Sequence, residues 1–453
     1  MVSLKKLALR GAIWTFVGYG LSNVIRLASN LVLTRLLVPE LFGLMALVYT
    51  FIIGLQLFSD IGLGPSVIQN KRGNDPDFLN TAWTLQVIRG FLLWLCCCII
   101  AWPVANIYSE PQLLLLIPII GFTTVLSGLD SMALHTLNRK VDMRMVMLFE
   151  IGVQTIGVAM TIILAFINPT VWALVIGSLT GATCRTVISH TLMPQRIPHR
   201  FNWDKSAVNE IISLGKWIFF STAVMFLATQ SDRLLLGKFV TLSFLGIYTI
   251  AFTLGDLPRK VNQKVYAKVL FPVMSKIADS PRSELRLKIM KSRKIALLGL
   301  MLIVLVLAGG GDLIINFLYN ENYSEAGWIL SIIALGLWPN LLADTLSPCL
   351  LAIGQPRYQA FGNFFSFLLI LVGIPLSFAI LSEDLARLGA VTSVALSEIP
   401  VYLAVVAGLI RERLSCIKQD IALTGLLIVL LSGVIGLRLS LGLGTPLDLF
   451  LSA

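Results

Sequence analysis

The chain has 453 residues, of which 57% are hydrophobic and only 13% are charged. Soluble domains carry about 25% charged residues, so this composition excludes an ordinary soluble domain. Apolar runs long enough to cross a hydrocarbon core of about 30 Å recur along the whole chain and predict an all-α polytopic membrane protein. Loops rich in Lys and Arg explain the net charge of +11, so nucleic acid is not an expected partner.

The predicted helices follow one another with short connections. We expect them at residues 12–37, 41–63, 81–104, 112–137, 146–167, 170–192, 211–236, 243–265, 294–318, 326–352, 359–381, 386–410 and 418–440. These thirteen segments fit a fold of about 12–14 transmembrane helices. The tail after residue 440 is too short for another full crossing, so a count of twelve and a partial fourteenth helix both stay open.

The first predicted helix carries a charge near its centre. Arg26 lies about halfway along residues 12–37, at a depth where a charged side chain costs roughly 2.5 kcal/mol or more. Tyr19, Asn23 and Asn30 share one helical stripe with Arg26. The stripe offers hydrogen-bond donors and one fixed positive charge, which indicates a polar cavity. The alternative is that Arg26 pairs with a buried carboxylate and only fixes helix packing.

Basic residues concentrate in every second loop. The largest group follows the eighth predicted helix and consists of Arg259, Lys260, Lys264, Lys268, Lys276, Arg282, Arg286, Lys288, Lys291, Arg293 and Lys294. The alternate loops hold hardly any basic residue beyond Lys238 and Arg387. The positive-inside rule therefore predicts a multi-pass protein of the bacterial inner membrane with a cytoplasmic N-terminus. Every external loop is then too short for the acceptor-binding domain of a glycan polymerase or ligase, so an enzyme is not expected.

The chain contains a weak internal repeat. A shift of 203 residues matches Trp14 with Trp217, Phe16 with Phe219, Gly43 with Gly246 and Thr50 with Thr253. Secondary transporters are commonly built from such repeats. We therefore expect two pseudo-symmetric six-helix lobes around a central cavity, at residues 1–194 and 211–411. Residues 195–210 form the predicted cytoplasmic linker, and residues 412–453 hold one or more additional helices.

Six segments with distinctive sequences are spread over most of the chain. They read LTRLLVPELFGLMAL at 33–47, GLGPSVIQNKRGNDPDFLNTAW at 62–83, LNRKVDMRMVMLFEIG at 137–152, SDRLLLGKFVTLSFLGIYTIAFTLGDLP at 231–258, VLFPVMSKIADSPRSELR at 269–286 and LLAIGQPRYQAFGN at 350–363. In this order they resemble the polysaccharide exporter, or repeat-unit flippase, branch of the multidrug/oligosaccharidyl-lipid/polysaccharide superfamily.

That resemblance implies two six-helix bundles that open alternately to the two membrane faces. It implies export of an undecaprenyl-pyrophosphate-linked oligosaccharide from the inner to the outer leaflet. This anionic lipid-linked oligosaccharide and membrane lipids are then the expected partners, with polysaccharide polymerase and glycosyltransferases as further candidates. By the same resemblance, the first, second, seventh and eighth helices line the cavity, which places Arg26, Asp232 and Arg233 on cavity helices. A charge at Arg26 departs from the pattern usual in that family.

Arginine suits a pyrophosphate because its planar guanidinium binds two oxygens at once. Arg89 on the third helix and Arg233 on the seventh therefore join Arg26 as candidate substrate ligands. The alternatives are structural. Arg89 pairs with Asp130 or extends to the cytoplasmic surface, and Asp232 and Arg233 neutralise neighbours at the outer rim.

Three acidic residues within predicted helices are candidates for coupling to a proton or a sodium ion: Asp130, Asp344 and Glu398. Glu398 lies two residues before Pro400, whose kink frees backbone carbonyls. A packing role is the alternative for each acid. The sequence has no Walker-type phosphate loop and no His, Cys or acidic set with metal-ligand spacing, so neither a cofactor nor a metal is expected.

A cation-coupled multidrug exporter of the same superfamily is the alternative function. Such a pump favours acidic cavity residues that hold cationic substrates, and the first helix has none between Ala12 and Leu37. Drug-resistance profiling separates the two functions.

Overall fold

The computed structural model describes residues 4–140, 142–193, 199–265 and 281–451. Throughout these ranges the chain forms helices joined by short connections, without a β-strand. Ten of the described helices are long and apolar enough to cross a membrane, or eleven if one bent pair counts as a single span. The prediction of an all-α, multi-pass membrane protein is therefore confirmed.

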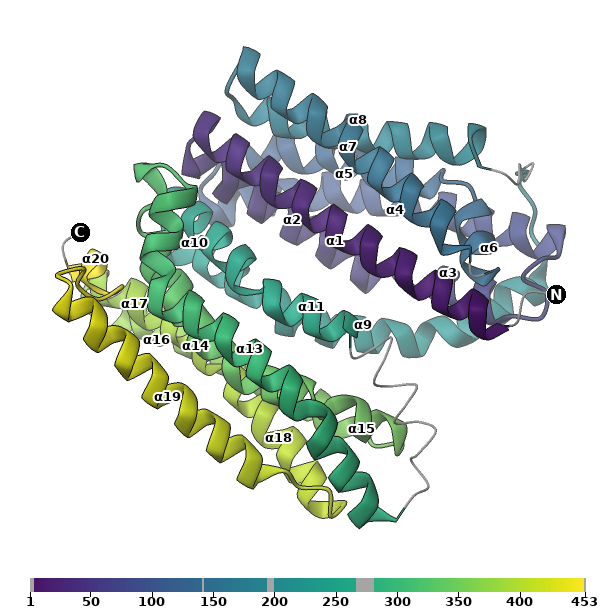
Figure 1. Ribbon diagram of the computed structural model, residues 1–453. Coiled ribbons are helices and arrows are strands. Elements are labelled where there is room, and N and C mark those ends of the chain that lie inside the picture. Colours follow the sequence, from purple (N-terminus) through teal and green to yellow (C-terminus); the bar gives the residue numbers. More distant parts are fainter. Residues whose placement is uncertain (1–3, 141, 194–198, 266–280, 452–453) are drawn as a thin grey trace. The chain divides into compact units, whose positions relative to one another are not determined.

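The chain divides into two compact units, Met1–Phe226 and Leu227–Ala453. The boundary lies inside one helix, α9 (Lys205–Phe239), so each unit holds part of it. Unit 1 contains the beginning of α9 and eight helices before it (Figure 1): α1 (Leu4–Leu36), α2 (Pro39–Phe58), α3 (Leu63–Gln69), α4 (Pro76–Tyr108), α5 (Leu113–Gly128), α6 (Ala133–Arg139), α7 (Met143–Ile167) and α8 (Val171–Thr191).

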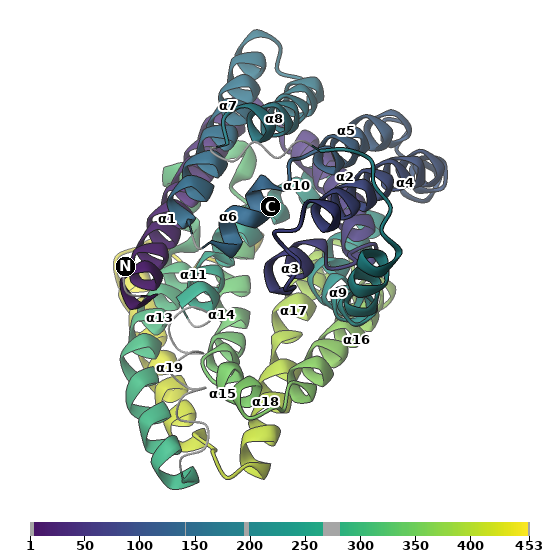
Figure 2. The same cartoon turned by 90° about the vertical axis from the view of Figure 1, so that its right-hand side faces the viewer.

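The long helices of unit 1 pack in pairs along their lengths. α4 packs against α5, α7 against α8, and α1 against α7, and Figure 2 shows α1 beside α7. The short helices α3 and α6 contact each other. Apolar side chains join α4 to the start of α9, where Phe78 and Trp83 belong to one buried cluster with Ala207 and Ile211. This cluster attaches the first part of α9 to unit 1.

Unit 2 holds the remainder of α9 and the helices that follow it. These are α10 (Leu242–Gly255), α11 (Leu257–Val265), α13 (Arg282–Leu318), the 3-10 turn η2 (Glu321–Tyr323), α14 (Ala326–Asp344), α15 (Ser347–Ala352), α16 (Arg357–Ile380), α17 (Glu383–Leu396), α18 (Glu398–Arg411), α19 (Ile417–Ser440) and α20 (Asp448–Leu451). α14 is the central helix of this unit, because it contacts α10, α13, α17 and α18.

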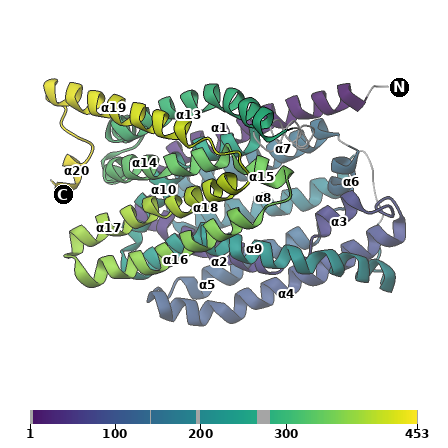
Figure 3. The ribbon, with the colours of Figure 1, turned by 90° about the horizontal axis from the view of Figure 1, so that it is seen from below.

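Two buried ion pairs attach α19 to α13, beside which it runs (Figures 1 and 3). Arg293 Nη1 lies 2.8 Å from Asp420 Oδ1, and the two side chains are 0% and 2% exposed. Further along, Arg438 Nη2 lies 2.5 Å from Asp312 Oδ2. Arg438 also donates to a backbone carbonyl of α13 next to Gly310, where the helix loses its regular geometry. These contacts make α19 an integral part of unit 2.

The tail after α19 folds back instead of crossing again. Arg438 donates to the carbonyl oxygens of Leu443 and Gly444 in the turn. The ring of Phe450 in α20 then packs edge-to-face on the buried Trp328, with centroids 5.3 Å apart. Within the described residues the tail holds one short helix, the four-residue α20 (Figure 3).

Four helices that the sequence predicts as continuous are interrupted. The predicted segments 112–137, 243–265, 326–352 and 386–410 correspond to α5 with α6, α10 with α11, α14 with α15, and α17 with α18. In three cases a proline stands in the first turn after the break, namely Pro258, Pro348 and Pro400. Proline has no N–H to bond to the preceding turn, so the helix restarts there.

Some sequence predictions fall outside the described residues. Lys268 and Lys276 of the largest basic group lie there, and so do the side chains of Lys264, Trp217 and Phe219. The division into lobes at residues 1–194 and 211–411 stays a prediction.

Candidate functional site

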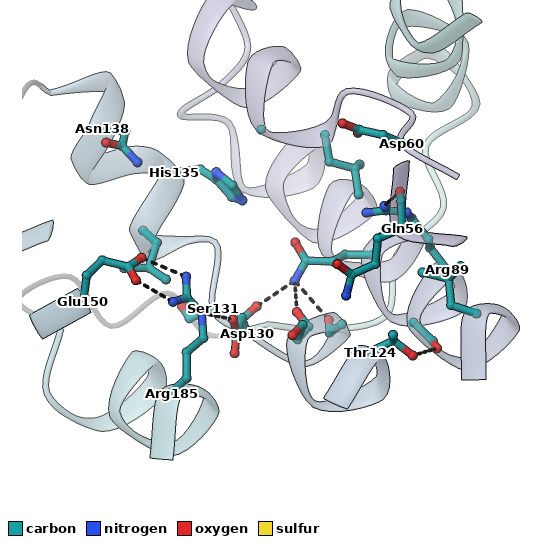
Figure 4. A pocket seen from close by; sticks show the side chains of 18 of the residues that line it. Gln56, Asp60, Arg89, Thr124, Asp130, Ser131, His135, Asn138, Glu150 and Arg185 are labelled. Carbon is teal, nitrogen blue, oxygen red and sulfur yellow. Dashed lines mark hydrogen bonds and ion pairs between the residues drawn. The ribbon is translucent and has the colours of Figure 1, made fainter. Parts of the chain in front are cut away.

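A polar cavity of about 450 Å³ lies within unit 1, among α2, α4, α5, α6, α7 and α8. Figure 4 shows it from close by. Its polar lining consists of Gln56, Asp60, Gln86, Arg89, Thr124, Ser127, Asp130, Ser131, His135, Asn138, Glu150 and Arg185. Polar groups among apolar helices are costly unless they are paired, so their partners decide what the cavity can do.

The interruption between α5 and α6 forms one wall of the cavity. α5 ends at Gly128, α6 begins at Ala133, and the two helices are bent by 59° relative to each other. A helix end leaves carbonyl oxygens without partners. Gln86 Nε2 of α4 donates to three carbonyls at this break, those of Ser127, Gly128 and Asp130, over 3.0–3.2 Å. The break is therefore stabilised by a side chain of the neighbouring helix.

Close packing of α4 on α5 at this point requires glycine. A Cβ atom at Gly90 would lie 2.6 Å from the carbonyl oxygen of Thr124 and 3.1 Å from the Cα atom of Gly128. The two backbones are thus in direct contact, which brings Gln86 within reach of the break.

Arg185 of α8 joins two carboxylates across the cavity (Figure 4). Its Nε lies 2.8 Å from Asp130 Oδ2, and its Nη1 and Nη2 lie 2.8 and 3.0 Å from the two oxygens of Glu150. Thr186 donates to the other Asp130 oxygen over 2.9 Å. The guanidinium also lies over the ring of Phe149, 5.4 Å from its centroid. Arg185 thereby connects α7 and α8 to the break between α5 and α6.

Arg89 of α4 lies on the other side of the cavity (Figure 4). Its Nη2 donates to the carbonyl of Gln56 over 2.7 Å, and its Nε donates to Ser59 Oγ over 3.0 Å. Both acceptors lie at the C-terminal end of α2, where helical carbonyls lack partners. Arg89 does not pair with Asp130, the structural alternative from the sequence, because Arg185 holds that carboxylate.

The charges that face the cavity do not balance. The guanidinium groups of Arg89 and Arg185 face the carboxylates of Asp60, Asp130 and Glu150. A pyrophosphate would add to this excess of negative charge, whereas a proton or a small cation would offset it. The arrangement therefore suits exchange of a proton or cation better than binding of a phosphate group.

The candidate residues on α1, Tyr19, Asn23, Arg26 and Asn30, do not line this cavity. Asn23 donates to the carbonyl of Tyr19 over 2.8 Å, and α1 packs on α7 through a hydrogen bond of Ser22. The side chain of Arg26 is exposed, and within the described part of the chain its guanidinium has no hydrogen-bond or ion-pair partner. The alternative of a buried carboxylate partner for Arg26 is therefore not found among those residues.

Asp232 and Arg233 make separate contacts within unit 2. Tyr248 donates to Asp232 Oδ2 over 2.6 Å, and Asp232 is 4% exposed. Arg233 Nη1 donates to Gln230 over 2.8 Å, and its guanidinium lies 5.2 Å from the ring centroid of Phe252. These contacts are compatible with a structural role, and contact with a substrate stays a prediction.

Asp344 and Glu398 belong to a second polar cluster, in unit 2. Arg259 of α11 donates to Glu398 over 2.9 Å and to Asp256 over 2.6 Å, and Gln263 donates to Asp344 over 3.0 Å. The cavity beside Glu398 measures only about 20 Å³ and has a mostly apolar lining. It has little room for a hydrated ion.

Asp130 and Asp344 occupy corresponding places in the two units. Asp130 follows α5 and precedes Ser131, while Asp344 ends α14 and precedes Thr345. Each aspartate therefore lies where a helix is interrupted. An arginine lies nearby in both units, but it comes from α8 in unit 1 and from α11 in unit 2.

Sequence reasoning does not identify Gln86, Asp60 or Glu150 as part of a site. Gln86 precedes Arg89 by three residues, so helical spacing puts the two on one side of α4. Glu150 is an acidic residue inside an apolar helix, and such a residue is a candidate for function. Its position close to a basic loop makes it resemble an ordinary loop charge in the sequence. The sequence does not indicate the partners of Arg185 either, because Glu150 and Asp130 are 35 and 55 residues away in the chain.

The cysteines form no metal centre in the described residues, where no group of three or more His, Cys, Asp or Glu side chains could hold a metal ion. Cys96 and Cys98 are exposed and Cys97 is buried. Consecutive side chains on a helix point about 100° apart, which explains why these three do not converge.

One family profile matches well over half of the chain. Its description is "Polysaccharide biosynthesis protein", and it covers residues 32–327. The teichuronic acid biosynthesis protein TuaB of Bacillus subtilis is 22% identical over 385 residues, which cover 85% of this chain and 79% of TuaB. The lipopolysaccharide biosynthesis protein WzxC of Escherichia coli is 22% identical over 309 residues, which cover 67% of this chain and 62% of WzxC. The match thus spans less than two thirds of WzxC.

Solved transporter structures share the fold. The lipid II flippase MurJ in an inward closed conformation superposes with a TM-score of 0.71 at 14% identity, over 95% of this chain and 93% of MurJ. An inward-facing multidrug resistance transporter of the MATE family gives a TM-score of 0.67 at 13% identity, over 89% of this chain and 96% of the transporter. At such identities the likeness concerns the fold alone.

Proposed function

Because this chain belongs to the family of polysaccharide biosynthesis proteins, we propose that it flips lipid-linked oligosaccharide repeat units across the cytoplasmic membrane by alternating access. The family match over residues 32–327 carries this proposal. The ten helices in the described ranges that are long and apolar enough to span a membrane support it. TuaB and WzxC are named for the biosynthesis of teichuronic acid and lipopolysaccharide, and MurJ is named for flipping lipid II. The proposed substrate class is an undecaprenyl-pyrophosphate-linked oligosaccharide.

Such a substrate carries negative charge, so its path needs positive charge and hydrogen-bond donors. Arg26 is the first candidate because its guanidinium is exposed and uncommitted among the described residues. Tyr19, Asn23 and Asn30 place further polar groups on the same stripe of α1. Arg89 is a weaker candidate, since two of its nitrogens already donate hydrogen bonds to residues at the end of α2.

The proposed orientation places the N-terminus in the cytoplasm of a bacterial cell, with the chain in the inner membrane. Basic residues in the turn between α3 and α4 and at the end of α6 support it. The proposed moving lobes are residues 1–194 and 211–411, with residues 195–210 as the linker and residues 412–453 as additional helices.

The cavity of unit 1 is the proposed site of coupling to a proton or a cation. Asp130 lies at a helix break, faces a cavity of about 450 Å³ and shares Arg185 with Glu150. Asp344 and Glu398 are the other candidates, but the cavity beside Glu398 is far smaller. Asp130 is therefore the acid that we favour.

Deletion of the gene in its host tests the proposed function. Lipid-linked repeat units should accumulate on the cytoplasmic face, surface polysaccharide should fall, and the wild-type gene on a plasmid should restore it. A multidrug exporter predicts a different pattern, with raised sensitivity to cationic drugs and unchanged polysaccharide. Normal polysaccharide without accumulated lipid-linked units would refute the proposal.

A further inference from the structure

The segment that leads into α9 is extended and attached to unit 1, and we call residues 199–205 the strap. Backbone N–H groups of Arg200, Asn202 and Asp204 donate over 3.1 Å to side-chain oxygens of Asn80, Thr84 and Thr81 on α4. At one end of the strap, the ring of His199 stacks on Trp83 with centroids 5.2 Å apart. At the other end, Asp204 pairs with Arg72 over 2.7 Å. The strap is therefore held along its whole length.

This attachment orients the side chains of the strap. Asn202 donates to Asp77 over 3.0 Å, and Asp204 also points toward unit 1. Successive side chains of an extended chain point to opposite sides, so Phe201 and Trp203 share one side of the strap. The ring of Phe201 borders Trp83 on α4, with centroids 5.2 Å apart. Phe201 is 72% exposed and Trp203 is 54% exposed. Leaving two large aromatic side chains in water is unfavourable, which indicates that something covers them.

α4 defines the depth at which this aromatic pair lies. The strap contacts α4 between Asp77 and Thr84, immediately before the apolar stretch Leu85–Tyr108. At 1.5 Å per residue that stretch is about 36 Å long, which is enough for a hydrocarbon core of about 30 Å. The strap therefore lies within about two helical turns of the hydrocarbon edge. Tryptophan is enriched at this headgroup level.

Basic side chains surround the aromatic pair. Arg200 and Lys205 flank it in the sequence and are exposed, as is Lys71 in the turn before α4. The acidic residue of the strap, Asp204, pairs with Arg72, which also pairs with Asp75 and lies 3.7 Å from Glu210. An apolar pair flanked in the sequence by two exposed cations, Arg200 and Lys205, matches the headgroup region of a leaflet that contains anionic lipids.

We propose that Phe201 and Trp203 insert into the headgroup region of the cytoplasmic leaflet, while Arg200 and Lys205 bind anionic lipid headgroups. This inference rests on the membrane orientation proposed above and is independent of the transported substrate. The membrane then holds the strap, and with it the start of α9, at the leaflet from which the proposed substrate is collected.

A fluorescent label at position 203 tests this contact. The six native cysteines are replaced, and one cysteine is introduced by Trp203→Cys. The matched control is Glu284→Cys in the first turn of α13, because the side chain of Glu284 is 53% exposed. Both proteins are labelled with NBD and reconstituted into vesicles of phosphatidylcholine, with or without phosphatidylglycerol.

We expect the label at position 203 to emit at a shorter wavelength than the control label. A lipid carrying a nitroxide near its glycerol backbone should quench it, and phosphatidylglycerol should increase this quenching. Adding Arg200→Gln and Lys205→Gln should abolish the increase and leave the quenching in phosphatidylcholine. Labelling at Phe201→Cys provides a second position if Trp203→Cys does not fold.

Three results would overturn the proposal. Water-like emission at position 203 without quenching by the lipid nitroxide would exclude insertion. Equal quenching in both vesicle types would exclude the role of anionic lipid. Shielding from lipid and aqueous quenchers alike would show that protein, and not membrane, covers the aromatic pair.

Discussion

The guanidinium Nε of Arg185 lies 2.8 Å from the carboxylate of Asp130. The other two nitrogens of Arg185 hold Glu150 on α7, so one side chain connects α7 and α8 to the interruption between α5 and α6. Protonation or cation binding at either carboxylate weakens its attraction to Arg185. Under the proposed coupling, a change of charge in the cavity would therefore be transmitted to the helix break.

Removing Arg185 should destabilise the protein and impair transport. In Arg185→Gln the buried Asp130 loses its cation, and we expect a loss of about 1–3 kcal/mol, seen as a lower thermal midpoint in detergent. The double variant Asp130→Asn with Arg185→Gln should recover part of the stability, because no carboxylate is then left unpaired. The control Glu383→Gln removes the partner of Arg387 at a side chain that is 80% exposed, and it should leave the midpoint unchanged. Wild-type stability of Arg185→Gln would contradict the assigned role.

The ion pair of Arg293 with Asp420 should dominate the attachment of α19. Both groups are buried, so Asp420→Asn leaves an uncompensated buried guanidinium and should cost about 3–5 kcal/mol. Thermal unfolding in detergent measures this loss. An apolar pair, Arg293→Met with Asp420→Leu, should be far more stable than the single variant. A single variant as stable as the wild type would show that the pair is not needed.

Acidification should loosen the strap. His199 Nε2 accepts a hydrogen bond from the Met132 N–H over 3.2 Å, so the docked ring is neutral at this nitrogen. Burial, assisted by the neighbouring His190, lowers the pKa of His199 to about 4, whereas an unfolded histidine has a pKa of about 6.5. The contribution of His199 to stability is therefore complete above about pH 6.5 and is lost as the pH falls toward 4.

The thermal midpoint between neutral and mildly acidic pH measures this effect, and His199→Asn should flatten the profile. Asp204 contributes to folding stability over a different pH range. Hydrogen bonds from Arg72 lower the pKa of Asp204 to about 2, so its contribution is lost only below about pH 4. If the thermal midpoints of the wild type and His199→Asn changed with pH in the same way, the predicted role of His199 would be contradicted.

How much of the fold can be predicted from the sequence depends on the kind of feature. The apolar runs predict the thirteen helical segments because a bilayer fixes both their length and their composition. Three of the breaks are also readable, since Pro258, Pro348 and Pro400 stand just after them. The break between α5 and α6 has no proline, and Gly128 with Asp130 does not distinguish it from a continuous helix.

The candidate site is less predictable than the helices. The sequence identifies Arg89 and Asp130, and both line the cavity of unit 1. It does not identify their partners, because Arg89 binds the carbonyl of Gln56 and Asp130 binds Arg185, both distant in the chain. Which charges meet depends on the tilt and rotation of each helix, and these are set by packing between helices.

Arg26→Ala should abolish export without harming the protein. No ion pair or hydrogen bond of Arg26 to the described residues is lost, so membrane insertion and the thermal midpoint should stay at wild-type values. Arg26→Lys keeps the positive charge but lacks the planar guanidinium, which can bind two phosphate oxygens at once. This variant should therefore retain only part of the export activity. The control Arg35→Ala removes an exposed arginine at the end of the same helix and should still export. Wild-type surface polysaccharide in cells carrying Arg26→Ala would remove this residue from the substrate path.

The most direct measurement follows a fluorescent undecaprenyl-pyrophosphate-linked oligosaccharide in liposomes that contain the purified protein. A membrane-impermeant reductant added outside bleaches only the outer leaflet, so continued loss of fluorescence reports movement between leaflets. We predict that the wild-type protein speeds this loss well beyond that in protein-free liposomes, and that the same amount of Arg26→Ala does not. Leaflet exchange at the protein-free rate with correctly inserted wild-type protein would contradict the proposed flippase function.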